Sequence, residues 1–156
     1  MSEGARLLAS VVLLSLWIGA GILFVAVVAP SAFAVLPSRT LAGQLVGRVL
    51  PVLFLSGVLV GLAAAVLARG GALSAWRLGS GLAVAAACAV SHFGIGGRIE
   101  RLREAIGGAL ESLPAGDPQR ALFGQLHALS VAGLGAAGLA AIVGLFATLA
   151  ALRQRA

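Results

Sequence analysis

The clearest shortage in this 156-residue chain is charge, because Asp, Glu, Lys and Arg together make up only 10% of the residues. Soluble domains carry about 25% charged residues, so this composition excludes an ordinary soluble protein. Four stretches have no charged residue at all: 7–38, 49–68, 78–97 and 121–152. About 20 apolar residues are enough to cross the ~30 Å hydrocarbon core of a bilayer. The sequence therefore predicts an integral membrane protein with four transmembrane helices.

Other shortages exclude particular chemistries. All five acidic residues lie outside the expected spans. This argues against a proton-coupled carrier that uses a carboxylate inside the membrane. Cys88 is the only cysteine, so an intramolecular disulfide is excluded. The motifs G-x-S-x-G, H-E-x-x-H, Walker A and C-x-x-C do not occur, and we expect a protein that is not an enzyme. The net charge of +6 comes from arginines that flank the spans, which indicates contact with anionic headgroups and not with nucleic acid.

The stretches predict an all-α membrane protein, an antiparallel bundle of four transmembrane helices in a single domain, 1–156. The expected parts are four spans and one extramembrane connector: about 7–29, 41–67, 73–97 and 121–152, with the connector at 98–120. Pro30 and Pro37 are expected to break the first helix, because proline lacks a backbone N–H. Ser38 and Asp117 are expected to cap the second and fourth helices.

Small residues predict where the helices approach one another. Gly70 and Gly71 indicate a tight turn between the second and third spans, which makes these two helices antiparallel neighbours. Small side chains also recur at four-residue spacing, a pattern that lets helix backbones pack closely in lipid. Three such ridges are expected to pack inside the bundle: Gly57 and Gly61; Gly81, Ala85 and Ala89; and Ala132, Ala136, Ala140 and Gly144.

A charged amphipathic helix is predicted to extend the third span. Apolar residues recur at three- and four-residue intervals over 95–113, with arginine and glutamate between them. We expect one continuous helix that bends near Gly94–Gly97 and leaves the membrane. Two placements stay open: the helix lies on the bilayer surface, or it projects and packs on a partner or on the extension of the last helix. The pair Gly107 and Gly108 is expected to weaken its far end.

Three polar side chains inside the spans are candidate ligands, since polar groups in lipid are costly. Cys88 and His92 are four residues apart, a spacing that suits two ligands of a soft metal on one helix face. Antiparallel packing places His127 on the same membrane side as His92. One interpretation is a haem or copper site formed by His92 and His127, with Cys88 as a further metal ligand. The other is two histidines hydrogen-bonded near the interface. Because a third ligand and a supporting carboxylate are lacking, no cofactor is part of the main prediction.

Several motifs resemble those of a known family. The first half contains W-x-G-x(4)-F from Trp17, A-P-x-x-F-x-x-L-P from Ala29, and an Ala-Gly pair at Ala42. The second half contains Phe123 and His127 at the start of the last span. Together they resemble the transmembrane protein 205-like family, four-span membrane proteins of unknown function. The resemblance implies a compact four-helix membrane protein and no particular activity. A looser similarity to copper-resistance-type four-helix membrane proteins supports the metal interpretation.

We expect this protein to act in transport or tolerance of a small solute or metal. The alternatives are a haem- or copper-binding membrane protein and a structural or assembly subunit of a membrane complex, docked through the charged helix. The expected partners are the lipid bilayer and, because four helices leave little room for a pathway, further copies of the chain in a homo-oligomer. Nucleic acid is not an expected partner.

The expected location is the bacterial cytoplasmic membrane. The first charge-free stretch exceeds the ~7–15 residues of a signal-peptide core, so we expect it to remain as a span. Five arginines fall on the side of the termini and six on the other side, so the positive-inside rule gives no bias. Partial burial of Arg48 and the length of the 98–120 connector favour cytoplasmic termini.

Overall fold

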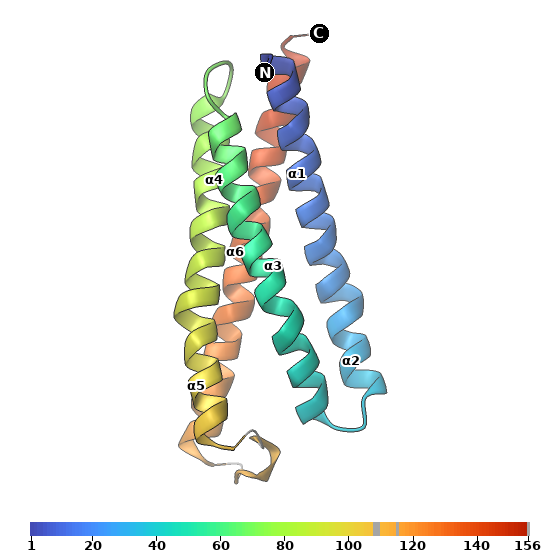
Figure 1. Ribbon diagram of the computed structural model, residues 1–156, viewed down its shortest axis with the longest axis vertical. Coiled ribbons are helices and arrows are strands. Elements are labelled where there is room, and N and C mark those ends of the chain that lie inside the picture. Colours follow the sequence, from blue (N-terminus) through green and yellow to red (C-terminus); the bar gives the residue numbers. More distant parts are fainter. Residues whose placement is uncertain (108–109, 115, 156) are drawn as a thin grey trace.

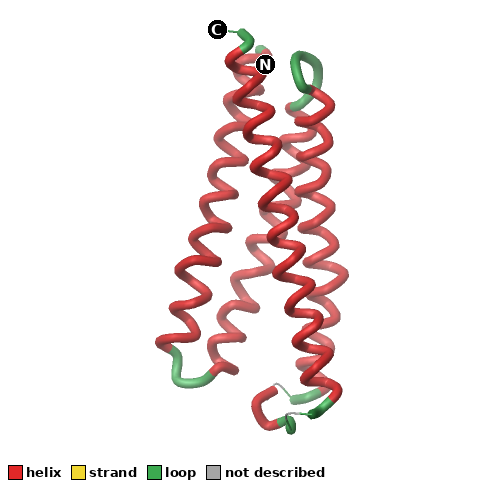
Figure 2. Tube along the Cα trace, turned by 180° about the vertical axis from the view of Figure 1, so that it is seen from behind, coloured by secondary structure: helices red, strands yellow, loops and turns green. Residues whose placement is uncertain are grey.

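In the computed structural model, the described residues (1–107, 110–114 and 116–155) form helices and turns, with no strand among them. Four helical runs are long and apolar enough to cross a membrane: Glu3–Val35, Arg39–Leu67, Ser74–Ala105 and Pro118–Arg153. They form an antiparallel bundle with both termini at one end (Figure 1). Seen from behind, the first and third connections lie together at the other end (Figure 2). The predicted all-α fold with four transmembrane helices is confirmed.

The first helical run continues through Pro30, so the prediction that this proline breaks the helix is wrong. The run consists of three consecutive segments: α1 (Glu3–Leu23), the π turn η1 (Phe24–Val28) and α2 (Ala29–Val35). The N–H of Ala29 donates to the carbonyl of Phe24, five residues back, so a wider turn accommodates the backbone where Pro30 has no donor. The run ends as predicted before Pro37, because Leu36 is extended with φ −77° and ψ 144°.

The predicted caps and the tight turn are confirmed. α3 (Arg39–Leu67) begins after Ser38, whose hydroxyl oxygen accepts the backbone N–H of Leu41 at 3.2 Å. α6 (Pro118–Arg153) begins after Asp117, whose carboxylate accepts the backbone N–H two residues on at 2.7 Å. After α3, Gly70 and Gly71 have φ values of 70° and 78°, a left-handed conformation that glycine adopts without steric cost.

The third helical run is shorter than predicted. Its segments are α4 (Ser74–Ala89), the π turn η2 (Val90–Gly96) and α5 (Gly97–Ala105). The continuous helix over 95–113 is wrong beyond Ala105, because Gly107 adopts φ 65° and ends the helix. A separate 3₁₀ turn, η3, follows at Leu110–Ser112, and Gly108 lies outside the described residues. α5 packs beside the start of α6, a contact that the projecting placement predicts.

Two of the three predicted small-residue ridges meet between α3 and α4. A Cβ added to Gly61 would lie 2.6 Å from the backbone N of Ala85 and 2.6 Å from the backbone O of Gly81. A Cβ added to Gly81 would lie 2.7 Å from the backbone N of Ala65. The two backbones are therefore in contact, and neither glycine leaves room for a side chain.

The third predicted ridge, on α6, is confirmed at Gly144, which is buried and where an added Cβ would meet α4. The start of this ridge has the wrong register. Ala132 and Ala136 are exposed, whereas Ala137 and Ala141 one residue further on are fully buried. Because most residues on this helix are small or apolar, the sequence pattern does not distinguish the packed face from the lipid face. Only the position of the neighbouring helices decides which residues are covered.

Trp17 links α1 to α3 in the centre of the bundle. The side chain is 4% exposed, and its indole N–H donates to the carbonyl of Leu53 at 3.0 Å. The ring fits because Gly57 has no side chain: a Cβ there would lie 2.7 Å from Cζ2 of Trp17 and 2.5 Å from Sγ of Cys88. Trp17, Gly57 and Cys88 therefore form one packed layer.

Polar contacts join the helices at the end that carries the termini. Arg77 of α4 is 3% exposed and donates from Nη2 to the carbonyl of Leu67 at 3.1 Å. Leu67 is the last residue of α3, where the helix dipole and the free carbonyls favour a cation. Glu3 and Arg155 form an ion pair at 3.3 Å, with side chains that are 30% and 47% exposed. One of these two contacts is buried and the other is in solvent.

We expect Arg77→Ala to lower the free energy of unfolding by about 2 kcal/mol, because it leaves the carbonyl of Leu67 without its donor and a gap in place of a buried side chain. Arg155→Gln removes only an exposed ion pair with Glu3 and is expected to cost less than about 1 kcal/mol. Thermal unfolding in a neutral detergent measures both. Equal shifts of the two unfolding midpoints would contradict the assignment of the stabilising contact to Arg77.

Arg48 of α3 is exposed, so the expectation of partial burial is wrong. That reason for cytoplasmic termini is therefore removed. The balance of five against six arginines leaves the positive-inside rule without a preference.

Candidate functional site

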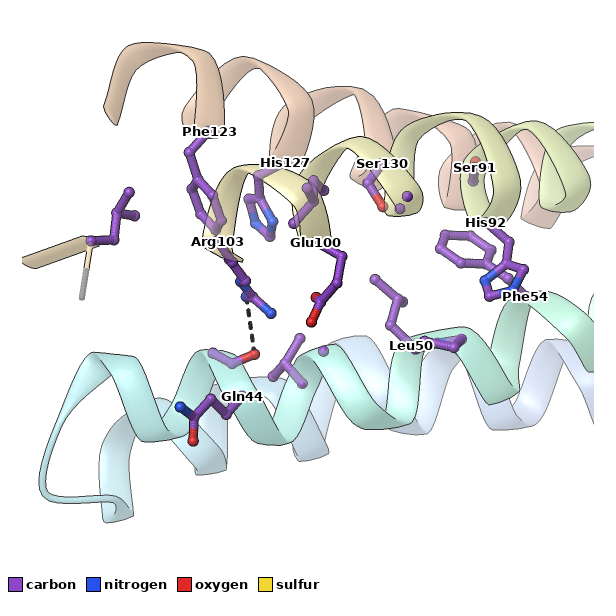
Figure 3. Close-up of a pocket in the computed structure, with 18 of the residues that line it drawn as sticks. Gln44, Leu50, Phe54, Ser91, His92, Glu100, Arg103, Phe123, His127 and Ser130 are labelled. Atoms are coloured by element: carbon purple, nitrogen blue, oxygen red, sulfur yellow. Dashed lines mark hydrogen bonds between the residues drawn. The ribbon is translucent and has the colours of Figure 1, made fainter. Parts of the chain in front are cut away.

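A cavity of about 720 Å³ lies between α3, α5 and α6 at the end of the bundle opposite the termini. α3 contributes residues from Arg39 to Phe54, η2 and α5 from Ser91 to Arg103, and α6 from Arg120 to Ser130. Figure 3 shows Leu50, Glu100 and Arg103 directed into one space between α3 and the other two helices, whereas Gln44 points away from it. The volume is within the ~300–1,000 Å³ that is typical of pockets for small ligands.

The cavity exists because the two halves of α3 pack differently. The second half lies against α4 through Gly61, whereas the first half diverges from α5 and α6 (Figures 1 and 2). Pro51 stands between the two halves and lines the cavity. A proline inside a helix removes one backbone hydrogen bond, here to the carbonyl of Gly47, and favours a change of helix direction.

The cavity has an apolar interior and a charged mouth. Leu50 and Phe54 line its inner part, toward the middle of the bundle. Near the connectors, the lining carries three arginines and one carboxylate: Arg39, Arg103, Arg120 and Glu100. The charge-free stretch 78–97 spans ~30 Å at ~1.5 Å per residue, so we expect the cations of α5 at headgroup depth. On this expectation the cavity extends from the headgroup layer into the hydrocarbon layer.

Arg103 reaches across the mouth from α5 to α3. Its Nη2 donates to the carbonyl of Gly43 at 3.2 Å (Figure 3), and its guanidinium carbon lies 5.4 Å from the ring centroid of Phe123 on α6. A cation at this distance from an aromatic ring is attracted to its π face. A Cβ added to Gly47 would lie 2.6 Å from Nη1. Gly43 and Gly47 of α3 and the ring of Phe123 on α6 thus form the binding position of the guanidinium.

Sequence reasoning treated Arg103 as one cation among several on a charged helix face and did not identify it as a site residue. The available signal was the pair Gly43 and Gly47, one helical turn apart at the start of a span, which marks a close approach by another group. Which group approaches could not be read from the sequence, because Arg103 is 60 residues from Gly43.

Both candidate histidines line this cavity. His127 lies near the mouth, with its ring parallel to that of Phe123 at 6.4 Å between centroids. His92 lies further inward near Phe54, and its ring meets that of Phe93 edge-on at 4.6 Å. The structure therefore brings the two imidazoles to one cavity but at different depths along it.

Cys88 does not share the cavity. Its side chain is fully buried in the layer formed with Trp17 and Gly57. The described residues contain no cluster of three or more His, Cys, Asp or Glu side chains that could hold a metal ion. The proposed ligand set of Cys88, His92 and His127 stays a prediction, in which only the two histidines face a common space.

The fold and the cavity define a four-helix membrane protein with one arginine-lined cavity at the end opposite its termini. Residues 12–107 match the family described as a domain of unknown function, DUF4149, and the chain belongs to this family. The matched region contains α3, α5 and Arg103 but ends before α6. No curated protein and no solved structure matches the chain.

Proposed function

We propose that this protein is a non-enzymatic membrane protein that binds a small amphipathic solute in the cavity and acts in its transport or tolerance. The observation that supports the proposal is the gradient along the cavity, from three arginines at the mouth to Leu50 and Phe54 inside. A solute with a polar head and an apolar body matches both ends. The volume suits a molecule of drug size.

The proposal also covers the oligomeric state of the protein, the membrane in which it lies and its family relationship. Four helices leave little room for a pathway inside one bundle, so we propose that transport requires a homo-oligomer. We propose a bacterial cytoplasmic membrane with cytoplasmic termini, and a relationship to the transmembrane protein 205-like family within the wider family. The mass of the protein in lipid nanodiscs tests the assembly: a strictly monomeric protein that moves no bound solute across liposomes contradicts transport.

Filling the cavity tests the binding site. We expect Leu50→Trp to weaken binding of dodecyl amphiphiles at least tenfold, because the indole occupies the apolar interior. Leu59→Trp is the control, since Leu59 is on the same helix and 68% exposed on its outer face. Native mass spectrometry in a neutral detergent, with dodecanol, dodecanoate and dodecylamine as probes, measures one-to-one binding. Failure of all three probes to bind, or equal effects of the two variants, would overturn the proposal.

A second candidate is a haem- or copper-binding protein, which is favoured by the location of His92 and His127 on one cavity. Imidazole nitrogens suit both cofactors. The colour and metal content of the purified protein test it. A haem absorption band that is lost in His127→Ala would support this candidate, whereas colourless, metal-free protein would count against it.

A third candidate is an assembly subunit that docks through α5. Arg98, Arg101 and Glu104 of this helix are exposed, so they are available to a partner. Co-purification of a stoichiometric partner, lost when these three residues are replaced, would support this candidate.

A further inference from the structure

The guanidinium of Arg103 is held at the cavity mouth by one hydrogen bond to a described residue. An arginine side chain carries five N–H donors, and among the described residues the acceptor of that one bond is the carbonyl of Gly43. Among the described side chains the one ion pair joins Glu3 and Arg155, so no described carboxylate neutralises Arg103. Glu100 lines the same cavity one turn earlier on α5 without pairing with it.

On this basis, and resting on the proposed function, we propose that Arg103 is the headgroup receptor of the cavity and that the solute is a single-chain amphiphile with an anionic oxygen headgroup. A planar guanidinium binds carboxylate or phosphate oxygens through two parallel hydrogen bonds. Such a pair is stronger than one bond to a neutral carbonyl. The bound anion therefore replaces the Gly43 carbonyl as the main acceptor, with Arg39 and Arg120 nearby on the same lining.

The shape of the cavity supports one chain and not two. Arg103 and Ser91 mark its ends on the third helical run, a distance of ~18 Å at ~1.5 Å per residue. Ile99, Leu50 and Phe54 line the path between these ends, so an acyl chain meets apolar side chains along its length. A volume of about 720 Å³ is in the range of drug-sized ligands, which accommodates a single-chain molecule better than a two-chain phospholipid.

The test compares headgroups on one chain. Dodecanoate, dodecyl phosphate, dodecanol and dodecylamine are titrated against the full chain in a neutral detergent by native mass spectrometry. We expect both anions to bind wild type at least tenfold more tightly than dodecanol and dodecylamine. Arg103→Gln is expected to abolish this preference while dodecanol binding stays unchanged. Arg101→Gln is the control, since Arg101 is exposed on the same helix and outside the cavity lining.

A second variant tests the position of the guanidinium without removing its charge. In Gly47→Ala the new Cβ would lie 2.6 Å from Nη1 of Arg103, and the flexible side chain moves aside at little cost to the fold. We expect the anion preference to fall severalfold. Equal binding of the alcohol and the anions to wild type, or an unchanged preference in Arg103→Gln, would overturn the inference.

The outcomes separate the two proposals and the two sources of anion. If Leu50→Trp blocks binding of all probes but the anions bind wild type no more tightly than dodecanol and dodecylamine, the binding site is supported. The role of Arg103 is then overturned. If no probe binds, both proposals are overturned. The last titration uses inorganic phosphate alone. If it binds as tightly as dodecyl phosphate, the site binds a free anion, and the proposal of an amphiphilic ligand is overturned. Tighter binding of dodecanoate or of dodecyl phosphate identifies the headgroup.

Discussion

Gly61→Ala is expected to destabilise the bundle by about 2–3 kcal/mol, although alanine is normally the better helix residue by about 1 kcal/mol. The new methyl group would lie 2.6 Å from the backbone N of Ala85 and 2.6 Å from the backbone O of Gly81. Backbone atoms of a packed helix cannot rotate away as a side chain does. α3 and α4 must therefore separate along their closest contact, which weakens the packing that holds membrane helices together.

Gly138→Ala is the matched control, because a Cβ added to Gly138 of α6 meets nothing within 4 Å. It is expected to leave stability unchanged or raise it by up to about 1 kcal/mol. Thermal unfolding of the two variants in the same detergent measures the difference. A lower unfolding midpoint in Gly138→Ala than in Gly61→Ala would contradict the described packing of α3 on α4.

Trp17→Ala is expected to have the largest effect of any single truncation, a loss of about 3–5 kcal/mol. The side chain is 4% exposed, fills the space over Gly57 and donates its indole N–H to the carbonyl of Leu53. Its removal leaves a cavity that neighbouring small residues cannot close. Trp17→Phe keeps most of the ring volume and loses the hydrogen bond, so it is expected to cost about 1–2 kcal/mol.

Trp76 supplies the control, because it is the other tryptophan of the chain and is 66% exposed. Trp76→Ala is expected to change the unfolding midpoint little. Chemical unfolding followed by the fluorescence of the remaining tryptophan gives the stabilities of both variants. Similar losses for Trp17→Ala and Trp76→Ala would mean that Trp17 is not at the centre of the packing.

These two predictions concern the closely packed part of the molecule, and the cavity lies beyond it. Gly57 and Gly61 hold α3 against its neighbours in its second half, and Pro51 marks the transition to the half that lines the cavity. Packing variants should therefore change stability, whereas Leu50→Trp and Arg103→Gln should change binding. A separation of these two effects in the variants would support a rigid end and a binding end in the same bundle.

Much of the fold could be predicted because its signals are local. The absence of charge over four long stretches defines the spans, since a charge in the hydrocarbon layer is costly. Ser38 and Asp117 cap helices through hydrogen bonds to residues two or three positions away, and Pro37 and the glycine turn act on their own backbone. Each of these features depends on a short segment and on the surrounding lipid or water.

The predictions that failed depend on how a helix continues or turns. Pro30 was expected to end a helix, but the helix continues through the π turn η1 into α2. The helix over 95–113 was expected to be continuous, but it ends at Ala105, before the left-handed Gly107. Cys88 and His92 both face α3: Cys88 packs on Gly57, and His92 lines the cavity near Phe54.

By itself, therefore, the sequence determined the class of protein, the number of spans and most helix ends. Charge, proline and glycine have this effect because each acts on its own backbone segment and on the lipid or water around it. Only the tertiary structure decided which side chains meet. Arg103 and Gly43 are 60 residues apart, and Arg98 and Arg101 on the same short helix stay exposed. α5 follows η2 directly and packs on α6, and Arg103 extends from it to α3. An amphipathic pattern shows that a helix has two faces, but the neighbouring helices determine what each face contacts.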